Sequence, residues 1–333
     1  MTGRANVLVT GGAGFIGSHA CKALAAVGYR PVTLDNFSTG NRAAVKWGPC
    51  IDGDIRDTAL VQETLSSHRI TAVMHFAAKA YVGESVSNPG LYYDNNVGGT
   101  ISMLKACQLA GISKFIFSSS CATYGIPLHL PVIEATAQNP LSPYGRSKLI
   151  GEQMIRDHSA AHGLQHVILR YFNAAGADPM GELAEHHDPE THLIPLALMA
   201  AYGRSTKLQV FGSDYATPDG TCIRDYVHVS DLARAHTDAL SYLLGGGANL
   251  AVNIGSGHGH SILDIVAEVQ RVTGRRIKMQ FVERRAGDPP VLIADSGLAE
   301  RVLGFVTENS DIGTIVNHAS AQFRIGTLNA NRA

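Results

Sequence analysis

Short apolar runs alternate with helix-like stretches along the first half of the chain. The apolar runs are rich in β-branched residues and predict strands, whereas the stretches between them have the apolar spacing of helices. Near-continuous apolar strands separated by helices are typical of a parallel sheet covered on both faces. The pattern therefore predicts an α/β protein with a Rossmann-type doubly wound parallel sheet. The expected strands are residues 6–10, 31–35, 71–76, 114–118 and 165–172, with helices at 15–28 and 96–111.

This alternation ends after Gly176. Residues 177–192 are polar and loop-like, and the elements that follow lack the regular order of strand and helix. Residues 225–240 and 249–255 have the patterns of a helix and a strand that could rejoin the sheet, and residues 325–333 are expected to form a loose tail. The chain is therefore expected to divide into an NAD-binding domain of residues 1–176 plus about 225–255 and a smaller α/β substrate-binding lobe of about 177–224 plus 256–333.

Composition mainly excludes some classes of partner. The formal net charge of −1 supplies no attraction to nucleic acid or to an anionic membrane, so neither is expected as a partner. No apolar stretch approaches the roughly 20 residues that span a bilayer. The five cysteines are scattered without a CxxC pair, which favours neither a disulfide framework nor a zinc site. The beginning of the chain lacks the apolar core of a signal peptide, and a cytoplasmic protein is expected.

A glycine-rich loop follows the first predicted strand. In the segment VTGGAGFIGSH, Gly11, Gly14 and Gly17 allow a tight turn, a close approach of backbone to pyrophosphate, and packing of the next helix on its strand. The N-terminus of that helix would then face the phosphates with unpaired N–H groups. Because the loop follows a strand and opens a helix, it predicts a dinucleotide site.

Asp35 ends the second predicted strand, 18 residues after Gly17. A carboxylate at about this distance accepts from the 2′-hydroxyl of NAD and repels the 2′-phosphate of NADP. The alternative is a surface acid that caps a loop. The segment DNFSTGN that starts at Asp35 is small and polar and has no arginine directly after the acid, so NAD is the predicted cofactor.

The segment SPYGRSK places Tyr144 and Lys148 four residues apart, on one face of a predicted helix. A nearby ammonium favours the tyrosinate and is expected to lower the pKa of the phenol. Such a tyrosine can take a proton from an alcohol while hydride leaves for a nicotinamide. The alternative is an exposed structural pair. Together with the serines at the end of strand 114–118, the pair predicts an alcohol/ketone redox centre.

The chain resembles the extended short-chain dehydrogenase/reductase family, and most closely its UDP-glucose 4-epimerase branch. The resemblance extends from residue 7 to about residue 295. It rests on the ordered motifs VTGGAGFIGSH, LDNFSTGN, GDIRD, HFAA, VGESV, YYDNNVGGT, FSSS, SPYGRSK, RYFN, VFGSDY, DGTCIRDYVHV and RRAGDPP.

The resemblance implies an isomerase that keeps NAD bound and interconverts UDP-glucose and UDP-galactose through a 4-keto sugar. Tyr144 would exchange the proton of the 4′-hydroxyl, Ser120 would hydrogen-bond the same oxygen, and Lys148 would hold the nicotinamide ribose and polarise Tyr144. It also implies a cofactor site that comprises Gly11, Gly14, Phe15, Ile16, Gly17, Asp35, Asn36, Phe37, Ser38, Thr39, Gly40, Asp54, Ile55, Phe76, Ala77, Ala78, Lys79, Ala80, Asn95, Ser118, Tyr144, Lys148 and Phe172.

For the UDP-sugar, the resemblance implies a second set of residues in the C-terminal half. Arg224 and Arg285 suit a pyrophosphate because guanidinium forks match its oxygens, the alternative being surface ion pairs. Leu292 stands where relatives carry either a bulky tyrosine or a small residue, which implies some tolerance of N-acetylhexosamines. The full set is Ser120, Tyr144, Asn173, His192, Leu193, Gln209, Val210, Phe211, Arg224, Arg285, Asp288 and Leu292.

The two positions after Ser120 help to distinguish the possible reactions. Dehydratases and decarboxylases of this superfamily carry an acid there, because elimination must move protons beyond the reach of the tyrosine. Cys121 and Ala122 cannot serve, which favours epimerisation. A 4-epimerase for another UDP-sugar (N-acetylhexosamine, xylose/arabinose or glucuronate) and a catalytically silent NAD-binding regulator remain alternatives.

Two further expectations concern metal and assembly. The segment EHHDPETH contains possible ligands, but the spacing from His187 to His192 is irregular and no distal ligand is evident, so no metal site is predicted. The resemblance implies a homodimer packed through helices at about 84–111 and 143–162.

Overall fold

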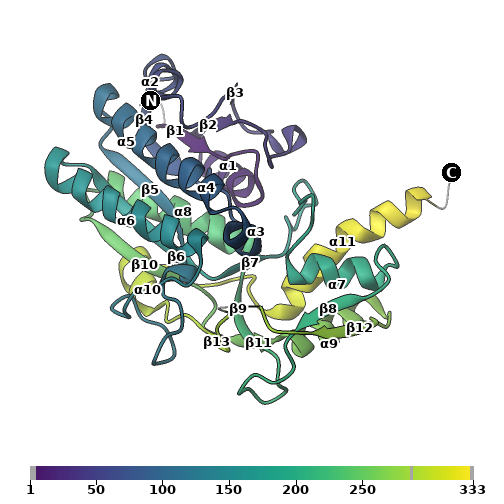
Figure 1. Cartoon of the computed structure of the whole chain (residues 1–333). Coiled ribbons are helices and arrows are strands. Elements are labelled where there is room, and N and C mark those ends of the chain that lie inside the picture. Colours follow the sequence, from purple (N-terminus) through teal and green to yellow (C-terminus); the bar gives the residue numbers. More distant parts are fainter. Residues whose placement is uncertain (1–4, 286–287, 331–333) are drawn as a thin grey trace.

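The computed structural model describes residues 5–285 and 288–330. Its centre is a parallel β-sheet of seven strands (Figure 1). The strand order is β10-β6-β5-β4-β1-β2-β3, so the chain starts in the middle, reaches one edge at β3 and returns through β4 to the other. This order confirms the doubly wound fold. The strands are β1 Asn6–Thr10, β2 Arg30–Asp35, β3 Cys50–Asp52, β4 Ile70–His75, β5 Lys114–Ser120, β6 Gln165–Tyr171 and β10 Leu250–Ile254.

Helices cover both faces of this sheet because successive strand side chains point to opposite sides. Val7 and Val9 pack in the apolar cluster on the face of α1, α8 and α10, whereas Leu8 packs in the cluster on the face of α2, α5 and α6. The strands are thus apolar on both faces, as the sequence predicts. The helices are α1 Phe15–Ala26, α8 Val229–Leu244, α10 Gly297–Leu303, α2 Thr58–Ser67, α5 Gly99–Ala110 and α6 Pro143–His162.

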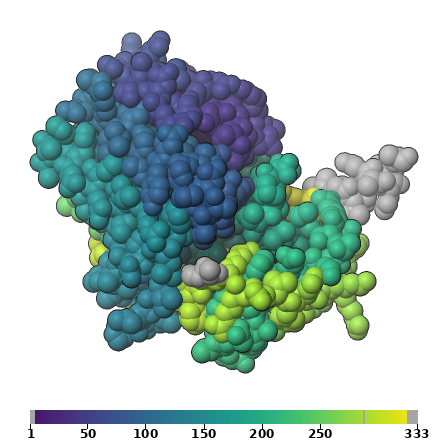
Figure 2. All heavy atoms as spheres, viewed as in Figure 1, coloured from purple at the N-terminus to yellow at the C-terminus, as the bar shows by residue number. Residues whose placement is uncertain are grey.

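A second group of elements packs beside the carboxyl ends of the large sheet. Three short strands pair with β9, another pair forms a separate ribbon, and α7, α9 and α11 contribute to a third apolar cluster. Figure 2 shows the surface hollowed where blue residues of the first part face green and yellow residues of the second. The elements are β7 Asn173–Ala175, β9 Ile223–His228, β11 Gly259–Ser261, β13 Val291–Leu292, β8 Leu208–Phe211, β12 Met279–Val282, α7 Leu193–Ala201, α9 Ile262–Thr273 and α11 Ile312–Ala330.

Short helical segments connect these elements. Between β4 and α5, two short helices lead into a π-helix, and single 3₁₀ turns follow β2 and β5. They are α3 Val82–Ser87, α4 Pro89–Tyr92, the π-helix Tyr93–Gly98, and the 3₁₀ turns Arg42–Ala44 and Cys121–Thr123.

Two expectations from the sequence are wrong in part. The helix expected at 225–240 begins only at Val229, because the preceding residues form β9 and pair with three other strands. The tail expected from residue 325 is helical as far as Ala330, where α11 ends, while residues 331–333 lie outside the described part. A hydrophobic pattern is read over a short stretch of residues. It therefore shows neither the distant strands that pair with β9 nor that the helix begun at Ile312 continues through residue 325.

Four of the five histidines that are buried in the described part of the chain have strongly lowered pKa values. Burial lowers the pKa of His75 to about 3. It also lowers the pKa of the other three, His19, His228 and His236, to about 4. The folded protein therefore holds these rings neutral at pH values where the unfolded chain protonates them.

We expect the free energy of unfolding to fall as the pH decreases from about 6.5 to about 4. The unfolded chain binds more protons in this window, and each histidine adds a slope of up to about 1.4 kcal/mol per pH unit. Urea unfolding at several pH values measures the slope. His236→Leu should reduce the slope, whereas His129→Leu, at an exposed position, should not. A stability independent of pH in this window would contradict the prediction.

Candidate active site

The glycine loop between β1 and α1 permits a close approach of backbone. Gly11 has a φ of +70°, in the left-handed region that glycine favours. A Cβ on Gly17 would lie 2.2 Å from the Gly11 carbonyl oxygen, so α1 starts this close to the loop only with glycine. No side chain caps the N-terminus of α1, which leaves its first N–H groups for an anion. The loop therefore fits the pyrophosphate of a dinucleotide.

Asp35 lies at the end of β2 and is 7% exposed. Its carboxylate accepts from the backbone N–H of Ala13 (3.0 Å) and from that of Phe37 (2.8 Å). These bonds tie the glycine loop to the loop after β2. Burial raises the pKa of Asp35, against these two hydrogen bonds. Carboxylate oxygens retain lone pairs for further donors, so the site also fits the ribose hydroxyls of NAD.

Gly17→Ala is expected to weaken NAD binding at least about tenfold, equivalent to about 1.4 kcal/mol. The added methyl would overlap the Gly11 carbonyl, so the loop must move away from the position that fits the pyrophosphate. Release of nicotinamide nucleotide from denatured protein measures the bound fraction. Gly90→Ala is the matched control, since a Cβ there meets no atom within 4 Å. Equal NAD content in the two variants would contradict the prediction.

Other predicted cofactor residues border the same region. Asn36 donates to Asp54 Oδ2 (2.9 Å), and Lys79 Nζ donates to Ser38 Oγ (3.3 Å). Asn95 is buried in the π-helix, a distortion that is frequent at functional sites. The remaining predicted residues lie at or after the carboxyl ends of strands: Phe15 and Ile16 after β1, Phe37, Thr39 and Gly40 after β2, Ile55 after β3, Phe76, Ala77, Ala78 and Ala80 after β4, Ser118 near the end of β5, and Phe172 after β6.

The three predicted reacting residues meet at the carboxyl end of β5. Ser120 is the last residue of β5, while Tyr144 and Lys148 lie one turn apart on α6. The Ser120 side chain lies close enough to Tyr144 to favour the tyrosinate, and Lys148 Nζ donates to the Ser118 carbonyl oxygen (2.8 Å). α6 begins at this point because Pro143 occupies its first turn and Ser142 caps it by accepting from the Gly145 N–H (3.1 Å).

Burial dominates the protonation of this centre. It raises the pKa of Tyr144, against the hydrogen bond from Ser120, and Lys148 is not among the groups that shift it. The expectation that Lys148 lowers the phenol pKa is therefore wrong for the protein without ligands, in which desolvation outweighs distant charge. Burial also lowers the pKa of Lys148 to about 7. The phenol is therefore held protonated near pH 7, whereas the amine gains and loses its proton near that pH.

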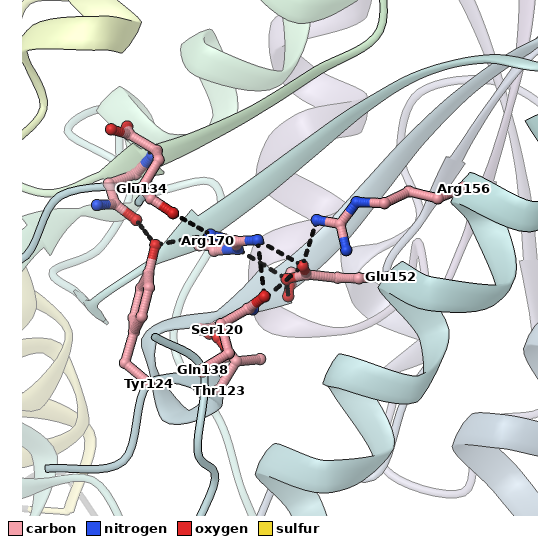
Figure 3. Close-up of polar contacts among 10 residues, drawn as sticks. Ser120, Thr123, Tyr124, Glu134, Gln138, Glu152, Arg156 and Arg170 are labelled. Carbon is pink, nitrogen blue, oxygen red and sulfur yellow. Dashed lines mark hydrogen bonds and ion pairs between the residues drawn. The ribbon is translucent and has the colours of Figure 1, made fainter. Parts of the chain in front are cut away.

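A buried ion pair supports the same helix (Figure 3). Arg170 on β6 donates from Nε to Glu152 Oε1 (2.9 Å) and from Nη2 to Oε2 (2.7 Å). Glu152, four residues after Lys148 on α6, also accepts from Ser119 Oγ (2.6 Å), directly before Ser120. Burial alone would raise the pKa of Glu152, but the hydrogen bonds and charge of Arg170 lower it overall. The pair therefore fastens α6 to β5 and β6 beside the reacting groups.

The same network extends to the edge of the sheet. Arg170 Nη1 donates to Tyr124 Oη (2.8 Å), which donates to Asn253 Oδ1 on β10 (2.7 Å). None of these contacts was predicted from the sequence. One sequence feature could have indicated a buried ion pair: Arg170 stands within the apolar run QHVILRYF, and a buried arginine requires an acidic partner. The pattern does not identify that partner.

Several predicted substrate residues lie on the strands around β9. Leu292 on β13 is paired with Arg224 on β9, and Asn173 on β7 is paired with Tyr226. Arg224, 8% exposed, forms an ion pair with Asp288. Burial would lower the pKa of Arg224, but Asp288 and its other neighbours raise it overall, so the buried guanidinium stays charged.

Apolar contacts join this strand group to the reacting centre. Leu292 belongs to one buried cluster with Cys121 and Phe172, next to Ser120. Burial raises the pKa of the Cys121 thiol to about 12, so this thiol is a packing group and no nucleophile. The other predicted substrate residues are Gln209, Val210 and Phe211 on β8, Arg285 with its guanidinium 4.0 Å from the Phe211 ring centroid, and His192 and Leu193 at the start of α7.

The chain belongs to the NAD dependent epimerase/dehydratase family, whose model matches residues 7–255. A UDP-glucose 4-epimerase of Rhizobium leguminosarum bv. trifolii is 51% identical over 313 residues, which cover 94% of this chain and 95% of that protein. A UDP-glucose 4-epimerase of Azospirillum brasilense is 48% identical over 314 residues, with coverage of 94% and 90%.

Solved structures agree with this assignment. A UDP-glucose 4-epimerase from Brucella ovis in complex with NAD is 59% identical, with a TM-score of 0.94 over 96% of this chain and 98% of that one. The enzyme from Bifidobacterium longum in complex with NAD⁺ and UDP is 36% identical, with a TM-score of 0.93 over 97% and 99%. No helix in the part of the chain that the structure describes is long and apolar enough to cross a membrane.

Proposed function

We propose that this protein is a UDP-glucose 4-epimerase that interconverts UDP-galactose and UDP-glucose at C4. The observation that carries this proposal is the meeting of Tyr144, Ser120 and Lys148 at the end of β5, beside a glycine loop that fits NAD. The names of relatives with 44–51% identity over most of their length support the substrate.

NAD, when bound, supplies the redox partner that C4 needs for loss and return of hydride. As a tyrosinate, Tyr144 would take the proton of the 4′-hydroxyl, and as the resulting phenol it would return that proton to the keto oxygen. The Ser120 hydroxyl donates to the same substrate oxygen and keeps it in reach of Tyr144. Lys148 holds a ribose hydroxyl, and its positive charge, when present, stabilises the tyrosinate. Inversion at C4 would require the 4-keto sugar to present its other face to the nicotinamide before the hydride is returned.

The residues after β5 support epimerisation over elimination. Cys121 and Ala122 form the 3₁₀ turn next to Ser120, where an eliminating enzyme would need an acid. The thiol, whose pKa burial raises to about 12, supplies no such acid near neutral pH. Redox exchange at C4 requires only the phenol and the dinucleotide.

Two arginines are proposed to bind the pyrophosphate of UDP. Arg224 is buried beside Asp288, and Arg285 is exposed with its guanidinium over the Phe211 ring, so both present forks that suit bidentate bonds to phosphate. We propose the same two domains as expected from the sequence. Residues 1–176 plus about 225–255 would bind NAD, and residues of about 177–224 plus 256–333 would bind the UDP-sugar.

A cytoplasmic homodimer is the proposed assembly. The exposed apolar side chains Val86, Ile101 and Leu109 on α3 and α5 support an interface through helices at about 84–111 and 143–162. Cys21, Cys50, Cys107, Cys121 and Cys222 are all free thiols, as is usual in a reducing compartment. Light scattering in solution measures the assembly, and a monomer would contradict it.

The test uses purified protein, UDP-galactose and no added NAD, with UDP-glucose as the measured product. Product without added cofactor supports internal redox with resident NAD. Activity on another UDP-sugar alone would keep the mechanism and change the substrate. No product from any UDP-sugar, even with NAD supplied, would overturn the proposal and favour an NAD-binding regulator.

Leu292 is expected to permit slow turnover of N-acetylhexosamines. It is 6% exposed in the apolar cluster that also contains Cys121, the residue after Ser120, so a smaller side chain there would leave more space near the reacting centre. Leu292→Ala should therefore raise the ratio of UDP-N-acetylgalactosamine to UDP-galactose turnover by about tenfold. Initial rates with the two substrates measure this ratio. No turnover of the N-acetylated sugar, where UDP-galactose reacts readily, would contradict the expectation.

A further inference from the structure

The loop between β7 and α7 brings four potential metal ligands together. Glu185, His187, Glu190 and His192 each present one ligand atom, and these atoms all lie within 4.8 Å of one another. All four come from the segment EHHDPETH, whose irregular spacing argued against a metal in the sequence. The fold of the loop, rather than helical or strand periodicity, creates the cluster.

The contacts within this cluster converge on two carboxylate oxygens. Glu185 Oε1 contacts Nδ1 of both histidines, at 3.5 Å from that of His187. Glu190 Oε1 lies 3.3 Å from His187 Nδ1. It also accepts from the backbone N–H groups of Thr191 (2.8 Å) and His192 (2.9 Å), which orient the carboxylate. Donors of a tetrahedral zinc site, with bonds of about 2.0–2.1 Å, lie about 3.3 Å apart.

Within the described parts of the chain, the carboxylates of this cluster are paired with histidines and not with lysine or arginine. The side chains of Glu185 and Glu190 are only 5% and 9% exposed. Among the residues that the structure describes, neither forms an ion pair with lysine or arginine. Nearby Glu182, at 49% exposure, does have such a partner in Lys22. The positive charge beside the two nearly buried carboxylates therefore comes from protonated histidine or from a bound cation that takes the place of those protons.

We propose that Glu185, His187, Glu190 and His192 bind one divalent transition-metal ion, with Zn²⁺ as the best match. Two imidazole nitrogens with two carboxylate oxygens suit Zn²⁺, whereas Mg²⁺ and Ca²⁺ prefer oxygen ligands alone. The two carboxylates match the charge of the ion. This inference goes beyond the proposed epimerase activity and does not depend on it.

The site would fasten the loop to the cofactor-binding part of the chain. The His187 ring packs edge-on against Phe15 in the first turn of α1 (6.2 Å) and Tyr81 before α3 (5.9 Å). His192 directly precedes α7. One ion therefore would link the start of α7 to the elements around the glycine loop, and its principal effect is expected on stability.

The experiment titrates ZnCl₂ into chelator-treated, untagged full-length protein by calorimetry and follows thermal unfolding. We expect about one ion per chain and a rise in Tm with added ZnCl₂. Co²⁺ in place of Zn²⁺ should give the intense visible bands of a tetrahedral site with nitrogen and oxygen ligands. No uptake of either ion would overturn the proposal.

Variants decide whether the uptake belongs to this cluster. His187→Gln and Glu190→Gln should each weaken Zn²⁺ binding at least about 100-fold, because loss of a ligand costs more than loss of an outer-shell partner. Glu190→Gln keeps an oxygen for the Thr191 and His192 N–H groups, so its fold should persist. His129→Gln, at an exposed position, is the matched control and should bind normally. Equal binding by all three variants would overturn the site.

Discussion

Tyr144→Phe is expected to lower kcat for conversion of UDP-galactose to UDP-glucose by about 10³-fold or more. The variant loses only the hydroxyl that exchanges the proton of the substrate alcohol. Its ring should keep the same buried place, since Tyr144 is 8% exposed. Cys121 cannot replace the phenol, because burial raises the pKa of its thiol to about 12. Initial rates of UDP-glucose formation measure the loss.

The pattern of the loss distinguishes a chemical role from a structural one. KM for UDP-galactose and the NAD content should change little, since the missing oxygen acts on the reacting centre. Tyr242→Phe is the matched control on α8, away from the end of β5, and should keep full activity. A Tyr144→Phe variant with more than a tenth of the original kcat would remove Tyr144 from its proposed role.

Glu152→Ala is expected to lower the free energy of unfolding by about 3–5 kcal/mol. The substitution leaves the Arg170 guanidinium buried at 3% exposure without its carboxylate, and Ser119 loses its acceptor. The Coulomb attraction in this pair offsets the desolvation of both charges only while both partners are present. Urea unfolding, with the slope checked for constancy, measures the change.

Two further variants separate a buried pair from a surface one. Glu268→Ala removes an acid whose partner Arg271 is 69% exposed, and this loss should be below about 1 kcal/mol. Glu152→Gln keeps the shape and some hydrogen bonds, so its loss should lie between the two. If Glu152→Ala destabilised no more than Glu268→Ala, the pair would not hold α6 in place.

The position of the catalytic helix depends on this pair. Tyr144, Lys148 and Glu152 are successive residues at spacings of four on α6, and the last of them bonds to β5 and β6. The local spacing identifies Tyr144 and Lys148 as neighbours. The same spacing does not show that Glu152 is buried and paired. Its partner Arg170 is 18 residues further along the chain and lies on a strand.

Local patterns were sufficient for most strands of the central sheet. β1, β2, β4, β5 and β6 all occur close to their predicted ranges, because each is a short apolar run buried on both faces. β3 was not predicted, since its three residues are partly exposed and carry no apolar run. The start of the helix at 225–240 was wrong because β9 is defined by pairing with distant strands.

The sequence by itself determined the features that depend on residues a few positions apart. These are the alternation of strand and helix, the glycine loop, and the row of Tyr144 and Lys148 along one helix face. Their physics is local, since the backbone conformation of each segment follows from its own residues.

Only the tertiary structure decided the features that join distant residues or depend on burial. It placed Glu152 against Arg170, Leu292 in one apolar cluster with Cys121, and the four potential metal ligands of the β7–α7 loop close together. It also showed that burial raises the pKa of Tyr144, contrary to the expectation from Lys148 alone. Desolvation and long-range pairing depend on the completed packing, which no short stretch of sequence contains.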